Sequence, residues 1–320
     1  MATYVLRRLI QAIPILVGIS VVSFLIINLA PGDPTDRFRS GRVSAETIQN
    51  LIRLYGLDKP LPEQFVSWFT AFWQFPFRSD AWGFSFVDGR PVVEKIFEKI
   101  PNTLELMGTS LIVTMIVSIP LGVLAAVKQY SWADKIITTL ATVGYALPSF
   151  VLGILLLYIF AIKLNMFPSF GRQSLGQEGN FPDFLWHLVL PVSSLAIQQV
   201  AGWSRYMRSS MLEVLQQDYM RTAKAKGLRG SRVLFKHGLR NALIPIITLL
   251  GLTLPSLLGG AAITETIFSW PGLGYMAVQS VGTNDYPVVL AIVMIGGAMV
   301  ILGNLVADIL YGVVDPRIKY

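Results

Sequence analysis

Six long apolar runs constrain this chain more than any other feature of its sequence. A helix rises about 1.5 Å per residue, so about 20 apolar residues cross the roughly 30 Å hydrocarbon core of a bilayer. Charged residues make up 14% of the chain, against about 25% in ordinary soluble domains. We therefore predict an all-α integral membrane protein with about six transmembrane helices, over 9–29, 103–127, 136–162, 184–202, 243–263 and 288–310.

The distribution of lysine and arginine predicts the orientation of these helices. Short basic loops stay on the cytoplasmic side, and the basic segments here are 1–8, 128–135 and 204–242. We therefore expect both termini in the cytoplasm. The first run is too long for the apolar core of a cleaved signal peptide, which holds about 7–15 residues. The expected divisions are a head and first span over 1–30, a long extracytoplasmic segment over 31–102, and a transmembrane core over 103–320.

The segment between the first two spans is polar, and its basic and acidic residues nearly balance. A loop of this length does not obey the charge rule, so its basic residues do not hold it in the cytoplasm. We expect helices over 45–55 and 63–75, and an amphipathic helix over 92–99 that lies along the membrane. The second of these is dense in aromatic side chains, which are typical of a core or a membrane-interface belt.

The most polar stretch of the core is 204–245, which carries nine Lys or Arg against two acids. Leu212, Leu215, Tyr219 and Ala223 share one face at helical spacing. Glycines at 227 and 230 then break the helix, and a second short helix is expected over 231–241. Membrane topology alone accounts for the charge. It does not account for about 40 residues with an apolar stripe and two glycine breaks, which are typical of a surface for a partner.

Several kinds of chemistry have no residues to support them. The chain has no cysteine and two histidines that are distant in sequence, which argues against a zinc site and against a Ser-His-Asp triad. No Walker A motif and no GxGxxG after a strand is present. Ionisable residues within the spans are scarce, with Glu265 and Asp308 only near span ends, whereas an ion-coupled transporter usually needs them. Uphill transport by this chain would need energy from another protein.

Seven short sequences along the chain resemble those of one family of transporters. They are LAPGDP, PNTLEL, IPLGVLAAVK, DYMRTAKAKGL, HGLRNALIP, ETIFSWPGLG and YGVVDPRIKY. Together they are similar to the permeases of ABC importers in the dipeptide/oligopeptide (peptide/nickel) branch, in the form of the first, or B-type, permease subunit. Thr222 and Ala223 keep only part of the Glu-Ala-Ala core of the family's EAA loop, and this departure is shared by the peptide branch.

The resemblance implies a function and a set of partners. The chain would be the transmembrane permease of an ATP-driven, binding-protein-dependent importer, forming half of a path for di- or oligopeptides. Its partners would be a second homologous permease, two ATPase subunits and an extracytoplasmic binding protein. The binding protein would dock on 35–101 and 264–287. ATP and Mg²⁺ would bind to the ATPases, so this chain would hold no cofactor and no metal and would not be an enzyme. Its place would be the plasma (inner) membrane of a prokaryote.

The same resemblance assigns the loop over 204–242 to coupling with the ATPases. One docking helix over about 212–226 is expected, with Leu215, Tyr219 and Ala223 as its apolar contact face. Arg221 and Lys224 would set its orientation, and Gly227 would end it. The full set of expected coupling residues is Leu215, Asp218, Tyr219, Arg221, Thr222, Ala223, Lys224 and Gly227.

The translocation path has weaker candidates, which are the polar residues of the fourth and fifth spans: Ser194, Gln198, Gln199 and Thr253. Hydrogen bonding between neighbouring helices is the alternative role for each of them. Nickel, glutathione or oligosaccharides are alternative substrates of the same machinery. There are two rival classes of function. The first is a stand-alone channel or secondary transporter, and the second is a membrane scaffold or enzyme. Transport by the purified chain without ATPases would favour the first of these.

Overall fold

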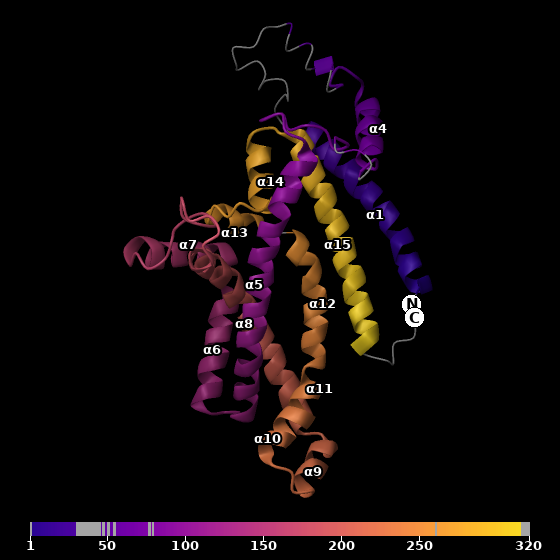
Figure 1. Ribbon diagram of the computed structural model, residues 1–320. Coiled ribbons are helices and arrows are strands. Elements are labelled where there is room, and N and C mark those ends of the chain that lie inside the picture. The colour runs from indigo at the N-terminus through magenta and orange to yellow at the C-terminus, as the bar shows by residue number, and fades with distance from the viewer. Residues whose placement is uncertain are drawn as a thin grey trace.

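Long helices make up almost all of the computed structural model (Figure 1). It describes residues 2–29, 46, 49, 52, 53, 56–75, 78, 80–259 and 261–314, so the predicted helix over 45–55 lies largely outside the described residues. Four helices are long and apolar enough to cross a membrane, and two bent helix pairs bring the number to as many as six. The predicted fold class is confirmed.

The helices follow one another with short connections over most of the chain. Their bounds are α1 Ala2–Leu29, α4 Leu61–Phe72, α5 Val92–Val127, α6 Trp132–Ala146, α7 Ser149–Leu156, α8 Phe181–Leu215, α9 Asp218–Ala225, α10 Gly230–Arg232, α11 Arg240–Ala242, α12 Ile244–Gly259, α13 Ala262–Ile267, α14 Leu273–Gly282 and α15 Tyr286–Val314. Two π-helices, η1 over Leu157–Lys163 and η2 over Val233–Leu239, continue α7 and α10. Among the described residues, Phe84 and Pro91 form an isolated antiparallel bridge.

In Figure 1, α5, α6 and α8 run side by side, and α12, α15 and α1 form a second group. The short helices α9 to α11 lie at one end of the molecule, which we call the α9 end, and α4 and α14 lie at the opposite end, the α14 end. The α12 and α15 helices approach closely where Gly303 faces Pro255: a Cβ on Gly303 would lie 2.6 Å from the Pro255 Cα. The absence of a side chain at Gly303 therefore allows α15 to lie this close to α12.

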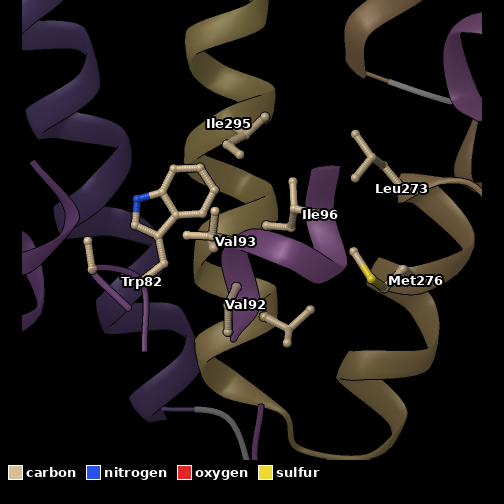
Figure 2. Packing of buried hydrophobic residues seen from close by; sticks show 10 residues of the cluster. Trp82, Val92, Val93, Ile96, Leu273, Met276 and Ile295 are labelled. Atoms are coloured by element: carbon tan, nitrogen blue, oxygen red, sulfur yellow. The ribbon is translucent and has the colours of Figure 1, made fainter. Parts of the chain in front are cut away.

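The expectation of a separate helix over 92–99 lying along the membrane is wrong. Residues 92–127 form one continuous helix, and one face of its first turns is buried against the rest of the chain, whereas Glu94 and Glu98 on the other face are exposed. Figure 2 shows the reason: Val92 and Ile96, both 0% exposed, pack between Trp82 and the side chains of Leu273 and Met276. Burial of these apolar side chains holds the start of α5 against α14 and α15.

The predicted third span, over 136–162, is not one continuous helix. Helix α6 ends at Ala146, and the two helices over Trp132–Ala146 and Ser149–Lys163 are inclined to each other by 101°. Pro148 causes the break, because a residue before proline is forced out of the helical region. Leu147 accordingly has an extended ψ of 125°.

The fourth span is longer than its hydropathy indicated. Helix α8 continues past Gly202, through the first part of the basic stretch, to Leu215. It continues because one face remains apolar: Trp203, Met207 and Met211, spaced four residues apart, are all buried. The basic stretch therefore begins as an extension of α8, up to Leu215, and the larger part that follows forms separate short helices.

A close contact between α5 and α8 provides a first test of the packing. A Cβ on Gly122 would lie 2.5 Å from the Met207 Cβ and 2.7 Å from the Ser204 carbonyl oxygen. We expect Gly122→Ala to push the helices apart and to lower the stability of the chain by about 1–3 kcal/mol. Gly108→Ala is the matched control, because the same helix leaves open space within 4 Å of that position. Thermal unfolding in detergent measures both, and equal midpoints would contradict the close contact.

Candidate functional site

The segment after α8 folds into a small unit with its own apolar core at the α9 end (Figure 1). Helix α8 ends at Leu215, the backbone of Gln217 is extended (φ −69°, ψ 148°), and α9 begins at Asp218. The expectation of one docking helix over 212–226 is therefore wrong. The change of direction at Gln217 brings α9 against η2, so that α9 and η2 cover each other's apolar sides.

Met220 and Ala223 form the centre of this unit, together with Val233 of η2. Met220 is 0% exposed, and the half-buried side chains of Leu215 and Leu228 pack against the same cluster. Two of the three residues expected to form the apolar contact face, Leu215 and Ala223, thus pack against the chain itself. The physical reason is that a short amphipathic helix buries its apolar side in the nearest available core.

The outward side of α9 is polar. The side chains of Asp218 and Arg221 are 95% and 77% exposed, and they form an ion pair at 3.5 Å. Thr222 and Lys224 are also exposed. Tyr219 is the third residue of the expected apolar face and lies at the edge of this surface, where its hydroxyl accepts a hydrogen bond from the Asn241 side chain at 3.2 Å.

The loop keeps this arrangement through a glycine. Gly227 follows the last turn of α9 with a φ of +72°, a left-handed conformation that glycine adopts without strain. Its N–H donates to the carbonyl of Lys224 at 3.0 Å. The predicted end of the helix at this glycine is confirmed, as is a second helical segment, over 230–242.

The surface of the unit is strongly basic. Seven cationic residues follow Asp218 and all are exposed: Arg221, Lys224, Lys226, Arg229, Arg232, Lys236 and Arg240. Phe235, which is 59% exposed, lies among them. Tyr219, at the edge of the same surface, is 41% exposed. A basic surface with exposed aromatic side chains is suited to a partner with acidic groups around an apolar pocket.

The four candidates for the translocation path lie in different environments. Ser194 is 0% exposed and its hydroxyl donates to the Pro191 carbonyl oxygen at 2.8 Å within α8. Gln198, Gln199 and Thr253 are half-buried. Their role in a path stays a prediction, and the burial of Ser194 favours the helix-packing alternative for that residue.

A buried polar network that the sequence did not predict joins α5 to α13 and α14. The Thr103 hydroxyl donates to Glu265 Oε1 at 2.9 Å and accepts from the Leu273 N–H at 2.8 Å. The Tyr275 N–H donates to Glu265 Oε2 at 2.9 Å. Burial raises the pKa of the Glu265 carboxyl, and these hydrogen bonds oppose the rise.

The neighbouring residues extend this network. The Asn102 side chain donates to the Pro271 carbonyl oxygen at 2.8 Å, and the Asn102 backbone carbonyl accepts from the Trp270 ring N–H at 2.8 Å. A Cβ on Gly272 would lie 2.5 Å from Glu265 Oε2, so the turn needs glycine there. The sequences PNTLEL and ETIFSWPGLG, noticed separately, therefore meet in space across more than 160 residues.

Ion pairs connect several other segments of the chain. Arg208 on α8 forms a double hydrogen bond with Asp134 at the start of α6, and Arg172 forms one with Glu105 on α5. Asp308, noted from the sequence near a span end, lies 2.8 Å from Arg8 of α1. Within the described ranges, no group of three or more His, Cys, Asp or Glu side chains is placed to hold a metal ion.

Comparisons with known proteins point in one direction. Residues 118–320 match the family model described as "Binding-protein-dependent transport system inner membrane component", and residues 1–107 match the one for the N-terminal part of such membrane components. The chain is 46% identical over the full length of both proteins to the "Oligopeptide transport system permease protein AppB" of Bacillus subtilis (strain 168).

Two further proteins extend the comparison. The "Glutathione transport system permease protein GsiC" of Salmonella typhimurium (strain LT2) is 40% identical, again over the whole of both chains. A chain of the MetNI methionine ABC transporter, solved in inward-facing conformations, superposes with a TM-score of 0.56 at 17% identity. That match covers 70% of this chain and 98% of the other, and it shows a shared fold.

Proposed function

The chain belongs to the family of binding-protein-dependent transport system inner membrane components, and we propose that it imports peptides as one of two permeases in an ATP-driven complex. It is a multi-pass membrane protein and the permease subunit of such an importer, a component without catalysis of its own. The other parts of the complex would be a second homologous permease, two ATPase subunits that bind ATP and Mg²⁺, and an extracytoplasmic binding protein. The α9 end would lie in the cytoplasm.

One observation carries the proposal for coupling: the outward side of α9 is polar and exposed while its inward side is fixed in the chain's own core. Because α9 is anchored in this way, it moves together with η2 and the end of α8. We place the ATPase contact on Asp218, Tyr219, Arg221, Thr222 and Lys224. Leu215, Ala223 and Gly227 would shape and support this surface rather than touch the ATPase.

The mechanism follows from linked equilibria. ATP binding closes the ATPase pair, and the closed pair binds one conformation of the permeases more tightly than the other. Closure of the ATPase pair would draw α9 of this chain and the corresponding helix of the second permease together. The long helix α8 would transmit that displacement into the membrane. The spans would then change from inward-open to outward-open, where the binding protein delivers its substrate. The half-buried residues Gln198, Gln199 and Thr253 remain our candidates for contact with that substrate.

The substrate assignment rests on the relative with 46% identity, whose name describes an oligopeptide permease. Glutathione is a second candidate because another full-length relative is described as a glutathione permease. Uptake of labelled oligopeptide by the complete complex, with glutathione as competitor, separates the two. Inhibition by oligopeptides and not by glutathione is the result expected.

A charge reversal on the outward side of α9 tests the coupling surface. We expect Arg221→Glu to lower ATP-dependent uptake by about 10-fold or more, because truncating or reversing a charge at a docking contact costs roughly 2 kcal/mol or more. Copurification of the ATPases with the permeases is the second measurement, and it should fall in parallel. Lys128→Glu, which changes the charge equally at an exposed position in the α5–α6 turn, is the control. If the two variants lowered uptake equally, the effect of Arg221→Glu would come from the change in net charge and not from a specific contact.

A further inference from the structure

A partly buried ion pair joins α6 to α8 near the α9 end. Arg208 Nε lies 2.7 Å from Asp134 Oδ1, and Arg208 Nη2 lies 2.8 Å from Oδ2. The side chain of Asp134 is 6% exposed and that of Arg208 is 25% exposed. A double hydrogen bond of this kind fixes orientation as well as distance, because the planar guanidinium and the carboxylate must be aligned. The pair therefore resists rotation and sliding of α6 relative to α8.

Asp134 is also held in place by residues close to it in sequence. Asp134 also accepts hydrogen bonds from the Tyr130 N–H at 2.9 Å and from the Thr138 hydroxyl at 3.2 Å. One turn along α8 from Arg208, the guanidinium of Arg205 lies 4.6 Å from the ring centre of Tyr145, a favourable cation–π distance. Helices α6 and α8 are thus connected at two levels, and the stronger connection is the one nearer to α9.

Helix α9 rests directly on the same part of α8. Its buried residues Met220 and Ala223 pack against Val214 and Leu215, the last residues of α8. Arg208 precedes Leu215 by about two helical turns, or roughly 10 Å. A displacement of α9 therefore reaches the ion pair through one short, continuous piece of helix. Beyond the pair, α6 leads to the bend at Pro148, where the chain turns by 101° into α7.

We propose that Arg208 and Asp134 are positioning residues that pass the movement of α9 to α6, so that α6 and α8 turn as one body during transport. The proposal rests on the proposed coupling of α9 to an ATPase. The pair touches neither substrate nor nucleotide in this scheme. Its loss should leave ATP hydrolysis running while fewer substrate molecules are moved for each ATP consumed.

The ratio of substrate imported to ATP hydrolysed, measured in vesicles with the complete complex, is the test. We expect Asp134→Asn and Arg208→Gln each to lower this ratio by about 10-fold, within the roughly 5- to 150-fold range of typical coupling between sites. The exchanged variant, Asp134→Arg with Arg208→Asp, should recover most of the loss. A purely structural role would lower assembly and both activities together, leaving the ratio unchanged.

A second ion pair provides a matched control. Arg172 and Glu105 form the same double hydrogen bond, at 2.8 Å and 2.8 Å, but Glu105 lies on α5 and is distant in sequence from α9. Glu105→Gln and Arg172→Gln should leave the ratio unchanged. An equal fall in these variants, or no fall in the Asp134 and Arg208 variants, would overturn the proposal.

A cross-link tests the same idea without relying on the stability of the single variants. The natural chain contains no cysteine, so Asp134→Cys with Arg208→Cys introduces the two thiols that a short bifunctional reagent can join. We expect the reagent to restore the ratio, because α6 and α8 would again move together. Blocked uptake after cross-linking would mean that the pair must open during transport, and would overturn the proposal. Absence of ATP-dependent uptake in the unsubstituted complex would instead refute the proposed function.

Discussion

Replacing Met220 by aspartate is expected to abolish ATP-dependent uptake, with a loss on the order of 100-fold or more, because it removes the support of α9. Met220 is fully buried among Ala223, Val233 and the half-buried Leu215 and Leu228. An unpaired carboxylate in such a cluster costs several kcal/mol. An isolated helix of eight residues is not stable in water by itself, so α9 should separate from the core and unfold locally.

The local character of this change gives it a distinct signature. The second permease should still copurify with the variant, since the membrane helices remain intact, whereas the ATPases should be lost. Met220→Leu is the control, because it conserves volume and apolarity and should cost less than about 1.5 kcal/mol. Retention of the ATPases by Met220→Asp would show that the contact does not depend on α9. Uptake and copurification are measured on the same membranes.

Replacing Thr103 by valine is expected to lower the stability of the chain by about 2–5 kcal/mol, because it removes one hydrogen bond from each of two buried polar groups. The Leu273 N–H loses its acceptor and Glu265 Oε1 loses its donor. Valine has nearly the shape of threonine, so packing changes little. The contact between the start of α5 and the α13–α14 turn should loosen first.

Two control variants separate the hydroxyl from the shape of the side chain. Thr103→Ser keeps both hydrogen bonds and should retain most of the stability. Thr142→Val removes a hydroxyl that is exposed and bonded within its own helix, at 2.8 Å to the Thr138 carbonyl oxygen, and should have little effect. Thermal unfolding in detergent is the measurement. An unfolding midpoint for Thr103→Val equal to that of Thr142→Val would contradict a supporting role for the network.

Glu265 lies near the end of the fifth span, and its hydrogen bonds explain why we do not assign it a role in proton transfer. Glu265 accepts from Thr103 and Tyr275, and its carboxylate lies against Gly272, so its oxygens are directed at partners within the chain. Glu265 on α13 thereby connects α5 with α14 through hydrogen bonds. Its buried position is that of a structural acceptor, and energy for transport would come from the ATPases instead.

Hydropathy by itself determined the fold class and the approximate number of membrane crossings. This succeeded because a bilayer requires about 20 apolar residues for each helical crossing, a requirement that is local in sequence. The glycine that ends α9 was also readable, because a left-handed residue after a short amphipathic helix has a local signal. The family motifs identified the type of transporter in the same way, through short runs of adjacent residues.

Only the tertiary structure decided which faces of these helices are available to partners. Periodicity placed Leu215, Tyr219 and Ala223 on one face, but it could not show that α8 and α9 are separate helices or that Leu215 and Ala223 pack inward. The extent of α8, the burial of the start of α5, the pairing of Arg208 with Asp134 and that of Thr103 with Glu265 were likewise hidden. Each depends on contacts between residues distant in sequence, and one chain read alone carries no local signal for such contacts.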